Sequence, residues 1–430
     1  MKNISLMHNI FALSTVQALS YVIPLITLPY VTRVLGVEAW GAVALVQVVL
    51  SYFTLVTNWG FGLSATRKVA EHRNDLNKLS EIFMATWLAQ WTLFVLACVV
   101  LSGMIGFISY FESNASFYLY GIGIILGNIL FPTWFLNGLE RIKELAVIQI
   151  ITRSIAVPLT FIFIRHPSDA PILLAITGFT AIVSGSLSIY WIKKTLNLNW
   201  ILPTMRQIYD EIKEGGSVFS STLWISCYTT LTPIILGLMA DVTAVGYYSF
   251  ADRFRVLAQS FLAPISQALF PRLSHLYKHD ISLACSLLVR SSKVILLISL
   301  LVSVSIWILA PYIVVLMGGD NFLPSIEILR WLSPVPFVVS LSNIFGVQIM
   351  IANHKITALN QILGIVGVIS ICIIFPLIYL LGAVGASINT LIVEILVSGG
   401  FMLYVFNSQQ LKNISNNIEM IKKNDKKNSI

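Results

Sequence analysis

"VGYYSFADRFRVLAQSFLAPISQALF" (residues 245–270) decides the class of fold, because charged side chains interrupt an apolar segment. The uncharged run after the last arginine has 15 residues, whereas a helix needs about 20 to cross a bilayer. The helix therefore has to start near Val245, which places Asp252, Arg253 and Arg255 about 10–15 Å from its outer end. Charged side chains at that depth usually face a bundle interior or a watery cavity. The stretch predicts a functional membrane helix rather than a charged loop.

The composition of the whole chain supports a membrane protein. Hydrophobic residues make up 57% and charged residues 11%, and the mean hydropathy is +0.84. A soluble domain has about 25% charged residues, so this chain has too few to cover a water-facing surface. The first apolar segment is long, contains polar residues and lacks an A-x-A cleavage site, which favours a retained span over a signal peptide. The four cysteines are scattered, so neither disulfides nor metal clusters are predicted.

The apolar segments predict an all-α polytopic protein of about twelve transmembrane helices in two six-helix bundles. The expected domains are an N-terminal bundle (1–192), a cytoplasmic linker (193–216), a C-terminal bundle (217–406) and a basic cytoplasmic tail (407–430). The predicted spans lie near 8–32, 40–62, 82–108, 115–137, 144–164, 170–192, 217–239, 245–270, 290–316, 328–350, 358–380 and 384–406.

The distribution of basic residues predicts the orientation. If both termini are cytoplasmic, 21 of the 27 Lys and Arg residues fall on the cytoplasmic side, in agreement with the positive-inside rule. The net charge of +8 therefore requires no nucleic-acid partner. The tail is expected to be attracted to anionic lipid. The outward loops are short, which argues against chemistry in a large extracytoplasmic loop.

Two short matches indicate an internal repeat. "VEAWGAVA" (37–44) aligns with "VTAVGYYS" (242–249), and "KELAVIQI" (143–150) aligns with "KITALNQI" (355–362). Both pairs lie at equivalent turns of the two predicted bundles, so the offsets support a duplication. Each repeat holds an even number of spans, so both are expected to have the same orientation, with a central cavity between the bundles.

Several segments resemble the Wzx-type polysaccharide (O-antigen) flippases of the multidrug/oligosaccharidyl-lipid/polysaccharide (MOP) exporter superfamily, whose fold is MATE-like. They are "IPLITLPYVTRVLGVEAWGAVAL" (23–45), "NWGFGLSATRKVAEHRNDLNKLSEIF" (58–83), "VGYYSFADRFR" (245–255) and "PISQALFPRLS" (264–274). The resemblance covers nearly the whole chain in span count and loop placement. It is specific for the superfamily and its polysaccharide branch, and it does not identify the sugar.

The resemblance implies a multi-pass protein of the bacterial inner membrane that moves an undecaprenyl-diphosphate-linked oligosaccharide by alternating access, and no enzyme activity. The expected partners are this lipid-linked oligosaccharide, membrane lipids and other polysaccharide-assembly proteins. Family analogy suggests an ion or proton gradient, and the sequence has no G-x-x-x-x-G-K-[ST] motif for ATP. No cofactor is implied.

Four arginines are candidates for binding the diphosphate, because a guanidinium binds two oxygens at once and keeps its charge. They are Arg33, Arg153, Arg253 and Arg255. Two interpretations of Arg253 and Arg255 are open: they face the substrate pathway, or they form an internal salt-bridge network with Asp252. A snorkelling role for Arg33 is also open.

The roles of the acidic residues in the predicted spans are also open. Glu394 lies deep in the twelfth span, where proton coupling and a hydrogen-bonded packing role are both open. Asp252 is a candidate for pairing or coupling. Glu327 and Arg330, three residues apart, are expected to form a local pair. His275 and His279 lack a third ligand nearby, so no metal site is predicted.

Three competing functions remain from the sequence. A lipid II-type flippase and a drug/cation antiporter share the expected fold, but an antiporter would favour acidic residues in its cavity. A membrane-embedded glycosyltransferase or polymerase belongs to a different class. Short outer loops and the absence of a D-x-D motif count against it.

Overall fold

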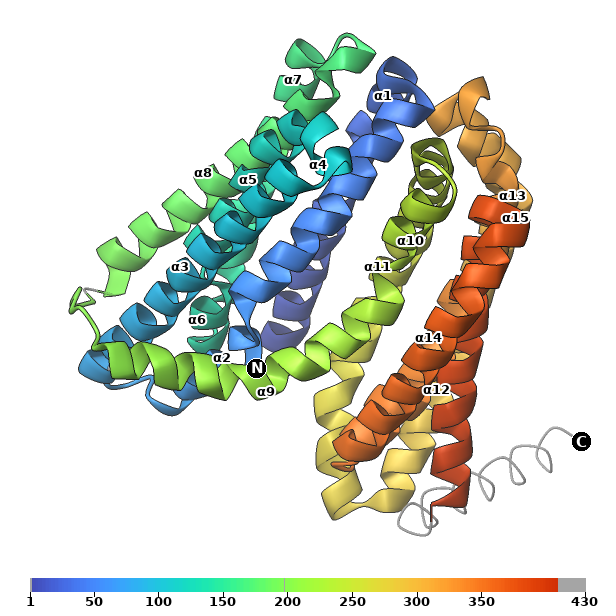
Figure 1. The fold of residues 1–430 in the computed structure, drawn as a ribbon. Helices are drawn as coiled ribbons and strands as arrows, with labels where there is room; N and C mark the ends of the chain where they lie inside the picture. Colours follow the sequence, from blue (N-terminus) through green and yellow to red (C-terminus); the bar gives the residue numbers. More distant parts are fainter. Residues whose placement is uncertain (1, 197, 409–430) are drawn as a thin grey trace, which may run out of the picture. The chain divides into compact units, whose positions relative to one another are not determined.

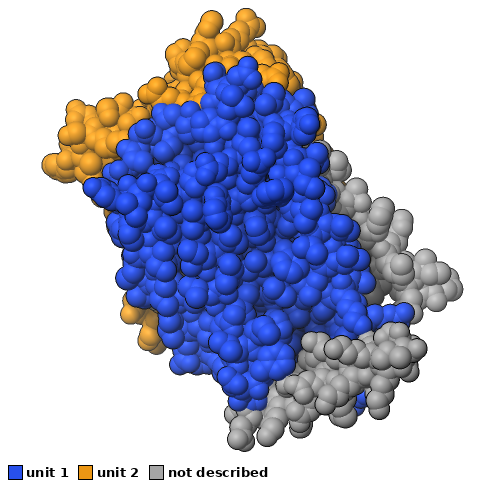
Figure 2. All heavy atoms as spheres, turned by 90° about the vertical axis from the view of Figure 1, so that its right-hand side faces the viewer, with its two compact units in different colours: residues 1–10, 227–430 blue, residues 11–226 orange. Residues whose placement is uncertain are grey.

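The computed structural model describes residues 2–196 and 198–408, and within them all regular elements are helices. This confirms the predicted all-α fold. Most of the predicted tail at 407–430 lies outside the described residues. The chain forms two compact units, an N-terminal unit (Phe11–Ser226) and a C-terminal unit (Cys227–Ile430 with the first ten residues), which Figure 2 colours separately. The predicted domain limits at 192 and 216 remain a prediction.

The helices up to the unit boundary are shown in blue to green in Figure 1. They are α1 (Lys2–Asn58), α2 (Phe61–Glu71), α3 (Leu76–Phe107), α4 (Ser109–Ser113), α5 (Ala115–Leu130), α6 (Thr133–Gly138), α7 (Ile142–Phe163), η1 (Pro167–Asp169), α8 (Ala170–Leu196) and α9 (Met205–Thr229).

The helices after the boundary run from green to red in Figure 1. They are α10 (Thr232–Met239), α11 (Val242–His279), α12 (Ile281–Gly318), η2 (Asp320–Phe322), α13 (Ser325–Leu332), α14 (Val335–Ser342), the π-helix η3 (Asn343–Ile351) and α15 (Ile356–Asn407).

Eight helices of the described chain are long and apolar enough to cross a membrane. Two of the eight contain two helices each, which meet at Gly36 (φ +73°) in α1 and at Gly382 (φ +56°) in α15. A positive φ suits glycine, which has no Cβ to clash with the backbone. Counting the two helices of α1 and of α15 separately gives ten apolar passes in the described chain. The predicted total of about twelve also requires α11 and the pair formed by α9 and α10, which are not among the eight.

The internal repeat is visible in the backbone. The turn before α7 has Glu140 at φ +58°, and the amide of Arg141 donates to the carbonyl of Leu136 at 2.8 Å. The turn before α15 has His354 at φ +59°, and the amide of Lys355 donates to the carbonyl of Met350, also at 2.8 Å. When the two turns are aligned by this hydrogen bond, Lys355 is equivalent to Arg141. The side-chain identities had aligned Lys355 with Lys143, two residues further along the chain.

The first sequence match is in register. The helix that follows Gly36 begins at Val37, and α11 begins at Val242 after its N-cap Asp241. The side chain of Asp241 accepts a hydrogen bond from the amide of Ala244, which satisfies a free N–H of the first turn. The same position is thus occupied by a glycine in one unit and by a capping aspartate in the other.

Helices α5 and α8 pack closely because glycines line their contact. A Cβ added to Gly127 would lie 2.4 Å from the backbone carbon of Ala181, and one added to Gly185 would lie 2.4 Å from the Cβ of Leu130. Gly123 and Gly178 approach each other in the same way. Small residues at a membrane-helix interface allow backbones to come together and gain van der Waals contact.

We expect Gly127→Leu to destabilise the N-terminal unit by about 1–3 kcal/mol, because the added side chain overpacks a contact between backbones. The measurement is the thermal unfolding midpoint of the purified protein in detergent. Gly103→Leu in α3 is the matched control, because a Cβ there has open space around it. An equal effect of the two substitutions would contradict the close-packing argument.

Candidate functional site

Helix α11 holds a charged cluster within the C-terminal unit. The guanidinium of Arg255 donates from Nε to Oδ1 of Asp252 at 2.5 Å and from Nη2 to Oδ2 at 3.1 Å. Its Nη1 donates to Oε1 of Gln259 at 3.1 Å. These residues lie three and four positions apart, so they share one face of the helix. The pairing of Asp252 with Arg255 that the sequence left open is present in the structure.

The cluster is largely shielded from solvent. The side chains of Arg255 and Asp252 are 14% and 24% exposed. Such a bidentate pair combines two charge-assisted hydrogen bonds, which offsets part of the cost of removing both charges from water. Three of the five N–H groups of a guanidinium are used here. Arg255 can therefore still donate to a further acceptor.

Two side chains of α15 lie close to this cluster. Glu394 is near enough to Arg255 for an electrostatic interaction. The hydroxyls of Tyr248, on α11, and Thr390, on α15, are hydrogen-bonded at 3.0 Å. Tyr248 is 4% exposed. The cluster thus joins α11 to the second half of α15 within the C-terminal unit.

Arg253 lies on the same helix but on another face. It is half-buried and close enough to Asp252 for an electrostatic interaction. Asp252 therefore interacts with two cations, of which Arg255 makes the direct hydrogen bonds. The structure brings Asp252, Arg253, Arg255 and Glu394 together in one unit.

The two remaining candidates belong to the N-terminal unit. Arg33 is exposed and lies one turn beyond Tyr30, whose hydroxyl donates to the carbonyl of Ile164 at 2.6 Å. Arg153 is exposed near the middle of α7. Ile164 is eleven residues further on, which corresponds to about 16 Å along a helix. Arg33 and Arg153 thus lie at different heights of their unit.

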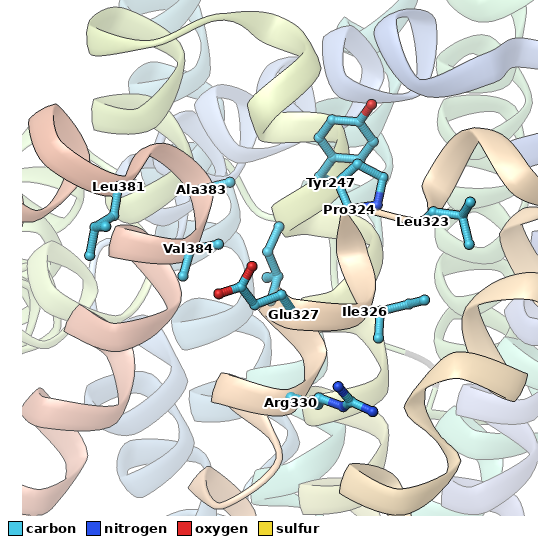
Figure 3. Close-up of a pocket in the computed structure, with 10 residues that line it drawn as sticks. Tyr247, Leu323, Pro324, Ile326, Glu327, Arg330, Leu381, Ala383 and Val384 are labelled. Atoms are coloured by element: carbon cyan, nitrogen blue, oxygen red, sulfur yellow. The ribbon is translucent and has the colours of Figure 1, made fainter.

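The expected pair between Glu327 and Arg330 does not form among the described residues, and this prediction was wrong. The guanidinium of Arg330 instead lies over the ring of Trp307, 5.4 Å from its centroid, a cation–π geometry. Figure 3 shows the Glu327 carboxylate and the Arg330 guanidinium pointing apart. Both residues line a cavity of about 520 Å³ between α11, α13 and α15, together with Tyr247. The aromatic ring on α12 competes for the arginine, which spacing along one helix cannot reveal.

Sequence reasoning missed three partners in the cluster. Gln259 is four residues after Arg255, so helical spacing alone could have indicated it. Tyr248 and Thr390 could not be paired from the sequence, because they lie 142 residues apart in the chain. Across the described residues, no group of three or more His, Cys, Asp or Glu side chains is arranged to hold a metal ion.

Solved structures share the fold of this chain. The chain matches the lipid II flippase MurJ in an inward closed conformation with a TM-score of 0.74 and 16% identity, over 95% of this chain and 91% of that one. It matches an inward-facing multidrug resistance MATE family transporter of the MOP superfamily with a TM-score of 0.70 and 17% identity, over 94% and 96%. The fold is therefore the two-lobed fold of MOP-superfamily transporters, as the resemblance implied.

Sequence comparison then gives the family. Residues 6–277 match the family model described as "Polysaccharide biosynthesis protein". A protein of Escherichia coli (strain K12) named "Putative O-antigen transporter" is 30% identical over 95% of this chain and 98% of its own length. A Shigella dysenteriae protein of the same name is 31% identical over 90% and 97%. The chain belongs to the polysaccharide biosynthesis protein family, and these relatives are named as transporters rather than enzymes.

Proposed function

We propose that the protein is a flippase that carries an undecaprenyl-diphosphate-linked oligosaccharide, the repeat unit of an O-antigen or capsule, across the bacterial inner membrane. The observation that carries this proposal is the charged cluster of α11, a helix that the sequence predicts to cross the membrane, in a chain whose relatives are named as O-antigen transporters. Both termini are proposed to be cytoplasmic, since that orientation satisfies the positive-inside rule.

The chemistry of the arginines suits the charged part of this substrate. A diphosphate needs cations that remain charged and can bind two oxygens, which a guanidinium provides. Arg255 has N–H groups beyond those given to Asp252 and Gln259, and Arg253 adds a second positive charge on the same helix. Arg33 and Arg153 are the proposed contacts from the N-terminal unit.

The proposed mechanism is alternating access. The lipid-linked oligosaccharide enters from the cytoplasmic leaflet, its diphosphate meets the arginines, and the two units change their relative arrangement to release the head group outside. A proton or ion gradient is the proposed energy source. Glu394, which interacts electrostatically with Arg255, is a candidate for the coupling group, because a carboxyl can take up and release a proton.

The location of the lipid-linked oligosaccharide tests this proposal. We expect deletion of the gene to leave the oligosaccharide assembled on its lipid but inaccessible to a membrane-impermeant glycan label in spheroplasts. Re-expression of the chain should restore labelling, and a strain that lacks the glycan polymerase is the control, because its lipid-linked unit should still be labelled. Failure to assemble the lipid-linked unit would favour a glycosyltransferase, and normal labelling with increased drug sensitivity would favour an antiporter.

A further inference from the structure

The first half of α9 is fixed to the N-terminal unit by one face. Ile208 and Ile212 pack against the hydrophobic core formed by α2, α3 and α6. The Nζ of Lys68 donates to Oε1 of Glu211 at 2.8 Å and to Oε2 of Glu214 at 2.7 Å. In Figure 1 this half of α9 runs across the ends of the bundle helices rather than along them. This half of α9 therefore runs roughly parallel to the plane of the membrane that the bundle helices are expected to cross.

The contact of this inner face is tight and leaves no room for a ligand. The indole N–H of Trp59 donates to the carbonyl of Ile212 at 2.8 Å, and its ring stacks on Phe219 at 4.2 Å. A Cβ on Gly215 would lie 2.5 Å from the carbonyl oxygen of Trp59. Any additional partner of α9 has to approach one of its exposed flanks or its outer side.

A flank of α9 beside the docked face presents apolar groups. Met205 and Tyr209, four residues apart, share this flank and are 84% and 63% exposed, and Leu202, in the turn before α9, is 80% exposed. These three residues are called the apolar stripe. Ile201, just before it, is 59% exposed. Trp200 contacts Phe83 and Trp87 of α3 edge-on, which joins the stripe to the side of a membrane-spanning helix. Contiguous exposed apolar groups of this kind mark an interaction surface.

Basic residues border the stripe. Lys193 and Lys194 end α8, and Arg206 and Lys213 follow the stripe along α9; all four are exposed. Asp210 is the exposed acidic residue within this part of α9. Aromatic and aliphatic groups edged by Lys and Arg are the pattern of helices that lie in the membrane interface. The positive charge is complementary to anionic headgroups rather than to zwitterionic ones.

We propose that residues 193–196 and 198–213 form a lipid-binding surface that sits in the headgroup region of the adjacent leaflet and prefers anionic phospholipid. Leu202, Met205 and Tyr209 insert below the headgroups, and the four basic side chains contact their phosphates. The lipid thereby holds the segment that connects the two units. This surface does not depend on the substrate proposed above.

The test uses the full-length protein with its native cysteines changed to serine and one cysteine placed at Met205, carrying an environment-sensitive fluorophore. The protein is reconstituted in vesicles of phosphatidylcholine alone or with phosphatidylglycerol, each with or without a headgroup nitroxide quencher. We expect a blue-shifted, lipid-quenched label at Met205→Cys. The matched control is Asn74→Cys, an exposed position in the turn between α2 and α3, which should remain water-accessible.

The preference for anionic lipid is measured by competition of phosphatidylglycerol for the quencher. Changing Lys193, Lys194, Arg206 and Lys213 to Gln should reduce that preference by about fivefold per residue, without moving the label out of the lipid. A water-exposed label at Met205→Cys would overturn the proposal. A label shielded from both water and lipid would also overturn it, in favour of a contact within the protein or with a second copy of the chain. Equal quenching in the two lipid mixtures would overturn the anionic preference.

Discussion

Arg255→Ala is expected to lower the stability of the protein by about 3–5 kcal/mol, the usual cost of removing one partner from a buried ion pair. The substitution leaves the Asp252 carboxylate without its two direct hydrogen bonds and removes a cation that interacts electrostatically with Glu394. The measurement is the thermal unfolding midpoint of purified protein in detergent. Gln259→Ala is the matched control, because it removes a single neutral acceptor of the same guanidinium and should cost less.

The double substitution of Asp252 and Arg255 to alanine separates folding from transport. Removing both charges should recover most of the lost stability, since replacing a buried pair by apolar groups is often neutral or stabilising. Glycan export should nevertheless stay low if Arg255 contacts substrate. If the stable double variant exports glycan at the wild-type level, the cluster has a structural role and does not bind the substrate.

Arg153→Ala and Arg253→Ala are each expected to reduce glycan export at least tenfold, about 1.4 kcal/mol of lost interaction, with normal protein levels. Arg153 is exposed on α7, so its loss should not disturb packing. Lysine at either position should rescue in part, because it keeps the charge but loses the planar fork. The measurement is surface glycan per cell, normalised to the amount of the protein in the membrane.

The control for these variants is Arg165→Ala. Arg165 is exposed just beyond the end of α7, where its Nε donates to the carbonyl of Ile162 at 3.1 Å. It follows the helix of Arg153 but lies beyond the end of that helix, so export should be unchanged. If both alanine variants at Arg153 and Arg253 export like the wild type, the arginines do not bind the diphosphate.

Much of the fold could be predicted because its determinants are local. A bilayer requires about 20 apolar residues per helix, so passes can be counted along the chain, and glycine at Gly36 and Gly382 allows two helices to meet without a loop. The register of the second repeat could not be predicted. It depends on backbone hydrogen bonds at Arg141 and Lys355, and side-chain identity misplaced it by two residues.

The site was predictable only where partners share a helix. Asp252 and Arg255 are three residues apart, and their contact follows from helical geometry. The links from α11 to Glu394 and Thr390 cross more than 130 residues, and no pattern in one sequence gives them. Helical spacing also predicted a pair that does not form in the described chain. Arg330 lies over the ring of Trp307 instead of pairing with Glu327, its neighbour on the same helix.

The matched turns before α7 and α15 bear on the origin of the chain. Glu140 and His354 both hold a left-handed backbone without being glycine, a conformation that L-residues adopt at a cost. Helices often end in this geometry, but here the two ends also lie at equivalent turns of the two sequence repeats. Duplication of an ancestral six-pass protein would leave this trace. Such an ancestor, with both ends on one side of the membrane, could have worked as a parallel homodimer before gene fusion joined its halves through α9.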